Sequence, residues 1–231
     1  MADSLTASVA SGALSDAFRE FIRERSFPCV GAKSALAHDR IEVIEARDIR
    51  SAWDDPNIYT SLTRFANRYR TEPEPFQSLA IVFDTAETLS EEAFEAALWA
   101  RLQSFADKDA FHGYAYDRRV SADVANPHFG LSFGEEAFFV VGMHPGASRP
   151  ARRFIRPVMV FNPHDQFETL RTQGRYEGLR SKIIERDVSI AGTPNPMLAR
   201  HGETSEARQY SGRPVAPGWR PPFDPKSDQA R

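Results

Sequence analysis

The stretch Ala137-Phe-Phe-Val-Val-Gly142 is a continuous apolar run, and a second one, Pro157-Val-Met-Val-Phe161, follows after a loop. Short runs of apolar, β-branched and aromatic residues between turn-forming segments are typical of buried strands. We predict that the first run is a central strand of a sheet and that the second is another strand. These two strands decide the fold, because everything else has to cover them.

Outward from these runs, the sequence alternates strand-like and helix-like segments. Apolar spacing and capping residues predict helices over residues 15–25, 30–37, 59–69 and 90–106, and a kinked or broken helix over 164–186, where Gly174 and Gly178 interrupt it. Further strands are predicted over residues 40–46 and 78–83, and residues 126–133 are predicted to be a loop leading to a strand. Because strands and crossover helices do not alternate strictly, we predict an α+β fold with a mixed or antiparallel sheet and helices mainly on one side.

A chain of 231 residues with 41% hydrophobic and 26% charged residues is expected to form one globular domain. We place this domain at residues 15–223, between a disordered Ser/Ala-rich start (1–14) and a disordered tail (224–231). Beyond Ile190, repeated prolines predict a long irregular C-terminal segment.

Charge and cysteine content exclude several classes of protein. A net charge of -3 gives no general attraction to nucleic acid or anionic lipid. No apolar window reaches the length of a membrane span, and no signal peptide is recognisable. The single cysteine, Cys29, excludes intramolecular disulfides and a cysteine-based zinc cage. We therefore expect a cytoplasmic protein without membrane or nucleic-acid partners.

Histidine and arginine gather after the two decisive strands. His144 and His164 each follow a strand and adjoin a proline, and imidazole can bind a metal or heme iron. The arginines that follow the first strand, Arg149, Arg152 and Arg153, could hold carboxylate or phosphate groups. On composition alone, loop histidines with backbone partners are the better explanation of the two histidines, and a solvated basic loop explains the arginines at least as well as a binding site does.

Two further segments carry candidate residues. Cys29 follows Pro28 near a helix start, where a thiol can ligate heme or act as a nucleophile, although a small buried core residue is the simpler interpretation. In the C-terminal segment, Glu203 and Glu206 could bind a guanidinium cation, whereas Arg208 and Arg213 could neutralise a carboxylate or a propionate. A solvated charged loop is the alternative for this segment. Gly-rich phosphate loops and the common hydrolase motifs are missing.

The order of several short motifs resembles one family. These motifs are Phe27-Pro28-Cys29, Ala137-Phe-Phe-Val-Val-Gly-Met-His-Pro-Gly-Ala-Ser-Arg149, Arg152-Arg153-Phe154, Val160-Phe-Asn-Pro-His-Asp-Gln-Phe167 and Glu206-Ala-Arg-Gln-Tyr-Ser-Gly-Arg213. Together they resemble the YqcI/YcgG family, and within it the guanitoxin-type heme-dependent guanidine N-hydroxylases. The resemblance extends from about Phe18 to Phe223.

This resemblance implies a heme b cofactor and an oxygenase that N-hydroxylates the guanidine group of arginine or an arginine-derived compound. Dioxygen and an external electron donor would be its other partners, and the oligomeric state, a homodimer included, is left open. We predict His144 as the axial ligand, followed by His164 and then Cys29. The arginines after the first strand would bind the propionates, and Glu203 and Glu206 the cationic substrate.

Two alternatives use the same residues. A heme or small-ligand binding protein without turnover, such as a sensor or carrier, needs only the binding groups. A non-heme metal enzyme would use His144, His164 and Asp165 as ligands.

Overall fold

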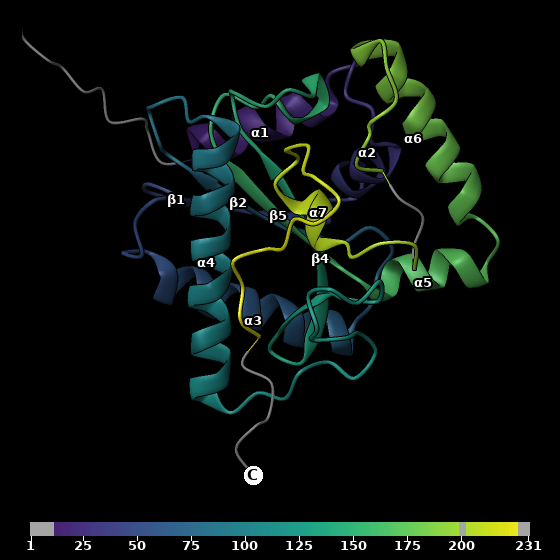
Figure 1. Cartoon of the computed structure of the whole chain (residues 1–231). Coiled ribbons are helices and arrows are strands. Elements are labelled where there is room, and N and C mark those ends of the chain that lie inside the picture. The colour runs from purple at the N-terminus through teal and green to yellow at the C-terminus, as the bar shows by residue number, and fades with distance from the viewer. Residues whose placement is uncertain (1–11, 199–201, 226–231) are drawn as a thin grey trace, which may run out of the picture.

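The computed structural model describes residues 12–198 and 202–225, with a five-stranded sheet at its centre (Figure 1). The strands are β1 (Ile41–Ala46), β2 (Ser78–Phe83), β3 (Leu131–Phe133), β4 (Glu136–Met143) and β5 (Val158–Pro163), in the order β1-β2-β5-β4-β3. β1 and β2 are parallel, and all other neighbours are antiparallel. This mixed sheet confirms the predicted α+β class, and the two decisive runs are the adjacent strands β4 and β5.

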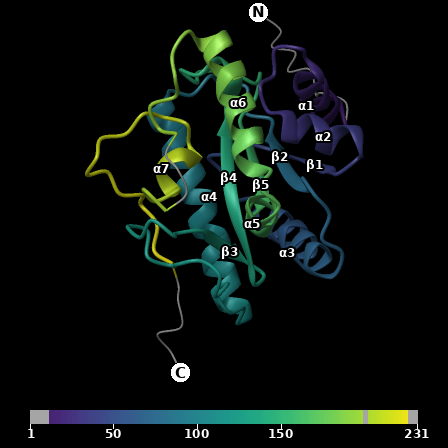
Figure 2. The ribbon, with the colours of Figure 1, turned by 90° about the vertical axis from the view of Figure 1, so that its right-hand side faces the viewer.

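Helices cover both faces of the sheet, not mainly one as predicted (Figures 1 and 2). α3 (Asp55–Thr71) and α4 (Glu91–His112) pack on one face, whereas α1 (Ala13–Arg23) and α2 (Val30–Ala37) pack on the other. The cause lies in the strands, because every residue of β2 is buried and β4 and β5 carry apolar side chains on both faces. A sheet that is apolar on both faces needs cover on both.

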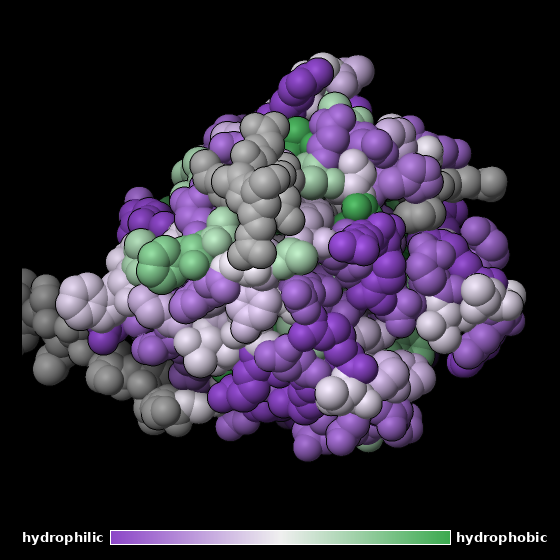
Figure 3. Space-filling model, turned by 90° about the horizontal axis from the view of Figure 1, so that it is seen from below, coloured by the Kyte–Doolittle hydropathy of each residue, from purple (hydrophilic) through white to green (hydrophobic). Residues whose placement is uncertain are grey.

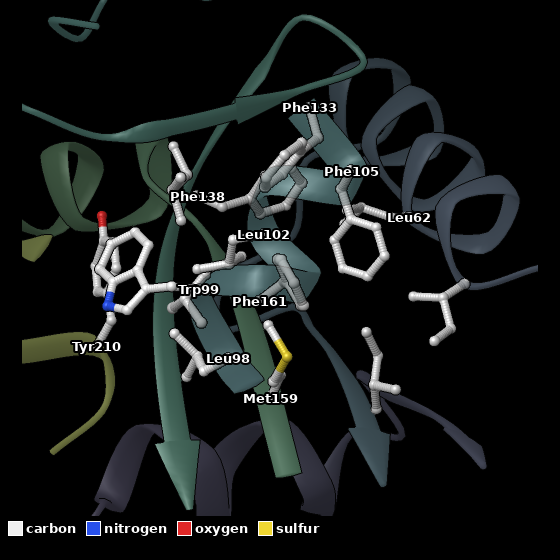
Figure 4. Close-up of a cluster of buried hydrophobic side chains, with 14 of the residues drawn as sticks. Leu62, Leu98, Trp99, Leu102, Phe105, Phe133, Phe138, Met159, Phe161 and Tyr210 are labelled. Carbon is white, nitrogen blue, oxygen red and sulfur yellow. The ribbon is translucent and has the colours of Figure 1, made fainter. Parts of the chain in front are cut away.

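The larger hydrophobic core lies between the sheet and the α3/α4 layer (Figure 4). Phe138 and Phe161 from the sheet meet Leu98, Leu102 and other side chains of α4 there. Burial of each such side chain stabilises the fold by about 1.5–3 kcal/mol. Two polar contacts also tie α3 to α4: Arg101 pairs with Asp55 at 3.1 Å, and the Tyr59 hydroxyl donates to Asp109 at 2.7 Å.

Helix ends follow from local residues. α4 extends six residues beyond the predicted end, to His112, and stops at Gly113, which adopts a left-handed φ of 76°. The predicted helix over 164–186 is two helices, α5 (Asp165–Thr172) and α6 (Tyr176–Ala191), separated by Gly174 with φ 66°. Gly178 does not break the helix, since it lies inside α6. A 3-10 turn, η1 (Pro150–Arg152), and a short helix, α7 (Ala207–Tyr210), were not predicted.

The described residues include parts of both terminal segments that were predicted to be disordered. α1 begins at Ala13 and buries Leu14, so the last two residues of the predicted disordered start belong to the folded domain. Asp224 and Pro225 of the predicted disordered tail are also described, and the Asp224 N–H donates to the Gln103 side chain at 2.8 Å, whereas residues 1–11 and 226–231 lie outside the described residues. The surface seen from below is mostly hydrophilic, with small separate hydrophobic areas (Figure 3). In the described part of the chain, no helix has the length and apolar character needed to cross a membrane.

Candidate functional site

An apolar cavity of about 290 Å³ lies on the sheet face opposite the α3/α4 layer, underneath α6. Figure 2 looks onto α6, which stands in front of β4. Side chains of β4 and β5 form the floor of the cavity, the start of α2 forms one wall, and the apolar side of α6 covers it. The residues include Phe139, Val141 and Val160 on the floor, Cys29 in the wall, and Leu179, Ile183 and Ile184 in the cover. A second cavity of about 200 Å³ shares the three α6 residues. Apolar cavities of this size are typical of small-molecule sites.

Cys29 lies in the wall of the larger cavity. It is the N-cap residue of α2, and its Sγ accepts a hydrogen bond from the Ala32 N–H at 3.4 Å. Burial raises the pKa of the thiol, and the amides of Ala32 and Gly31 lower it by less. Cys29 is therefore a neutral thiol in an apolar wall, and a metal or a cation beside it would be needed to make it a thiolate.

Arg149, which is buried, and Asp187, which is partly buried, form an ion pair at one end of the cavity. Arg149 comes from the loop after β4, just before η1, and Asp187 comes from α6. The Arg149 guanidinium also donates to the Thr193 carbonyl at 2.9 Å. This pair therefore holds the C-terminal half of α6 against the loop that follows β4.

Arg152 lines the same cavity but binds backbone oxygens. Its guanidinium donates to the carbonyls of Gly142 and Tyr210, both at 3.0 Å, and of Gln209 at 2.9 Å. Burial lowers the pKa of Arg152 to about 10, so it keeps its charge at neutral pH. Among the described residues, no carboxylate forms an ion pair with it, so this end of the cavity carries excess positive charge.

The other predicted arginines lie elsewhere. Arg153 is exposed and donates to the carbonyls of Ala147 and Ser148. Arg208 donates to the carbonyls of residues 215–217, and Arg213 pairs with Glu95 on α4 at 2.6 Å. None of these three lines the apolar cavity. Their contacts hold the C-terminal segment and the loop after β4 in place.

His144 is buried at the end of β4 but does not line the apolar cavity. Its ring stacks on Phe94 of α4, with ring centroids 4.2 Å apart. Burial lowers the pKa of His144, so the imidazole is neutral. The packing of this ring on α4 places it on the sheet face away from Cys29.

His164 lies at the opposite end of the sheet from His144. β4 and β5 are antiparallel, and the His164 N–H donates to the Ala137 carbonyl at the start of β4, whereas His144 follows the end of β4. At about 3.4 Å per residue, the two histidines are roughly 20 Å apart. His164 contacts Glu206 at 3.3 Å and lines a cavity of about 70 Å³. One metal ion cannot be shared by two histidines at this separation.

The predicted acidic residues also separate. Glu206 lines the second cavity beside α6, whereas Glu203 is exposed and lines neither. Within residues 12–198 and 202–225, no three or more His, Cys, Asp or Glu side chains gather in a way that could hold a metal ion. The structure therefore brings together Cys29, Arg149 and Arg152, and leaves the other predicted site residues outside this cavity.

Sequence reasoning missed the residues that α6 contributes. Asp187 and the apolar residues of α6 line the cavity because this helix folds back over the sheet. On the cavity floor, Asn162 accepts from Ser78 at 2.8 Å and donates to the Phe139 carbonyl at 3.2 Å. Asn162 stands in a stretch that the sequence already marked, and a polar residue inside an apolar strand was the signal that could have identified it.

Comparison with known proteins gives one match. The model of the family described as YqcI/YcgG family matches residues 18–224, which is most of the chain. No curated protein and no solved structure matches this chain.

Proposed function

The chain belongs to the YqcI/YcgG family, and from this premise we propose that it is a heme-dependent monooxygenase that N-hydroxylates the guanidine group of arginine or an arginine-derived compound. The observation that carries the proposal is the apolar cavity under α6, with a thiol in its wall and two arginines at one end. In the balanced reaction, the guanidine, dioxygen, two electrons and two protons give the N-hydroxyguanidine and water. An external donor supplies the electrons.

The residues of the cavity fit a heme group. Apolar side chains from the sheet and from α6 suit a porphyrin, and a cysteine thiolate is a known axial ligand of heme iron. Arg152, whose charge no carboxylate of the described residues neutralises in an ion pair, would bind a propionate. Arg149 would bind a propionate once its ion pair with Asp187 is broken. We therefore assign Cys29 as the residue that would hold the iron, in place of His144, which packs against α4.

Heme bound here would supply the reductive activation of dioxygen. The chain itself has three tasks. Cys29 would hold the iron, the arginines would bind the propionates and so orient the porphyrin, and the apolar side chains of α6 would keep water away from the reacting guanidine nitrogen.

Spectra of the purified protein test the axial assignment. We expect a Soret band in the wild type, a strongly red-shifted ferrous–CO band typical of thiolate ligation, and loss of both features in Cys29→Ser. His144→Ala and His164→Ala should keep the wild-type spectrum. If Cys29→Ser keeps an unchanged Soret band while His144→Ala loses heme, the histidine is the ligand and the Cys29 assignment is wrong.

Turnover distinguishes an enzyme from a carrier or sensor. The heme-loaded protein is incubated with a panel of guanidines, a reductant and ¹⁸O₂, and products are analysed by mass spectrometry. We expect one labelled oxygen on a guanidine nitrogen. A protein that binds heme but forms no such product from any guanidine is a ligand-binding protein, and one that binds no heme refutes the proposal.

A further inference from the structure

Asp187 is the one acidic residue among the described residues that line the apolar cavity. Its side chain is 16% exposed, and it projects from α6 toward the loop after β4. The residue has no part in the heme assignment made above. It is, however, a carboxylate at the edge of an apolar space, and such a group needs a cationic partner.

The partner present is itself a guanidinium. Asp187 pairs with the guanidinium of Arg149, which has a second anchor at the Thr193 carbonyl. The carboxylate therefore already binds a guanidinium at the wall of the cavity, through a charge-assisted hydrogen bond from one guanidinium nitrogen of Arg149 to one oxygen of Asp187. A substrate guanidinium of the same shape and charge can take the same place.

The charges of the cavity favour this exchange. Arg149, Arg152 and Asp187 together leave one excess positive charge. The two propionates of a heme would turn it into one excess negative charge and would attract Arg149 away from Asp187. A guanidinium cation then restores neutrality, whereas an uncharged ligand does not.

We propose that Asp187 is the residue that binds the substrate guanidinium, in place of Arg149, and so selects cationic guanidines over neutral analogues. This inference rests on the proposed function, because it takes the guanidine as substrate and the cavity as its site. Glu206 lines the second cavity and not this one.

Calorimetry on the purified full chain, as it is obtained with its cofactor, tests the assignment. The probes are butylguanidine, which carries the cation and no carboxylate, and butylurea, its uncharged analogue. Three variants are compared: Asp187→Asn, Arg149→Gln, and Glu185→Gln, which removes the same charge from an exposed position of α6. Circular dichroism and thermal melting check that each variant is folded.

We expect the wild type to prefer butylguanidine. Asp187→Asn should bind butylguanidine at least about tenfold more weakly, since a tenfold change corresponds to only 1.4 kcal/mol, and should bind butylurea as before. Arg149→Gln should bind butylguanidine at least as tightly as the wild type, because Arg149 turns to a propionate in the loaded protein and leaves Asp187 to the ligand, and Glu185→Gln should match the wild type.

Several results would overturn the inference. These are no binding of butylguanidine by the wild type, equal losses for both probes in Asp187→Asn, and Asp187→Asn affinities equal to those of Glu185→Gln. If the proposed function is wrong instead, the protein contains no heme or forms no hydroxylated product, while its binding of butylguanidine still depends on Asp187.

Discussion

At the scale of single residues, Glu136 shows how a buried carboxylate makes stability depend on pH. Its side chain is 1% exposed and accepts from Arg119 at 2.8 Å. Burial raises the pKa of Glu136 to about 7, with a further increase from nearby Asp117. Because the folded state holds this proton more tightly than the unfolded chain, the stabilising effect is complete below the unfolded pKa and is lost as pH rises toward 7.

We therefore expect the free energy of unfolding of Glu136→Gln to exceed that of the wild type increasingly as pH rises from 5 to 8, by roughly 1–3 kcal/mol in total. Urea titrations at both ends of this range measure the difference. Glu135→Gln, which removes the same charge at an exposed neighbour, should show no such trend. Parallel pH profiles of wild type and Glu136→Gln would contradict the assigned pKa.

The Cys29 thiol gives a second prediction at this scale. Since burial raises its pKa, we expect iodoacetamide to modify it much more slowly in the folded protein than in urea at pH 8. The folded-state rate should continue to rise with pH above the ordinary range of a thiol. Mass spectrometry of quenched samples follows the reaction, and equal rates in folded and unfolded protein would show that the thiol is not shielded.

How much of the site could be predicted differs from residue to residue. Arg149 and Arg152 could be found because they follow a recognisable strand closely. His144 and His164 look alike in the sequence, since each follows a strand and adjoins a proline, yet the antiparallel pairing of β4 and β5 separates them. Asp187 has no local signal, because its role depends on a partner 38 residues away.

At the scale of elements, β4 approaches α4 so closely that Gly142 has no room for a side chain. A Cβ there would lie 2.8 Å from atoms of both Leu98 and Phe94. We expect Gly142→Ala to lower the free energy of unfolding by about 1–3 kcal/mol through overpacking. Urea denaturation measures this change.

A glycine on α6 is the matched control. A Cβ on Gly178 would meet no atom within 4 Å, and the residue lies inside a helix. Gly178→Ala should therefore raise the free energy of unfolding by about 0.5–1 kcal/mol. If both substitutions had the same effect, the close packing of β4 on α4 would not be the cause.

The α6 helix itself is weakly anchored. None of its residues is buried, although its apolar side covers the cavity. We expect its amides to exchange hydrogen much faster than those of α4, and we expect hemin to slow exchange in α6 more than elsewhere. Mass spectrometry of peptides from both helices tests this, and α6 protection equal to that of α4 without ligand would contradict it.

Most elements could be predicted, because helical periodicity and apolar runs are local properties. The ends of the helices could not be predicted. α3 begins four residues before the predicted start, with Pro56 in its first turn, and α4 continues to His112. The short α7 depends on Tyr210 packing against Trp99 and Phe139, which are distant in sequence. The parallel pairing of β1 with β2 likewise has no local signal.

At the scale of the whole molecule, the sheet separates two different environments. The face toward α3 and α4 is a filled core of large aromatic and aliphatic side chains. The other face is covered by α1, α2 and α6 and encloses the cavity. Sequence periodicity identified the apolar strands, but it could not show that one face is filled and the other partly empty, since that depends on how α6 returns over the sheet.

The bonds of Arg152 to the carbonyls of Gln209 and Tyr210 have a consequence for the order of events in a cell. A ribosome releases the sheet, the thiol and α6 well before it releases residues 209 and 210. Until those residues emerge, the Arg152 side chain lacks two of the oxygens that position it. Any ligand that depends on this arginine is therefore captured only after residues 209 and 210 have left the ribosome, later than the folding of the sheet that carries the cavity.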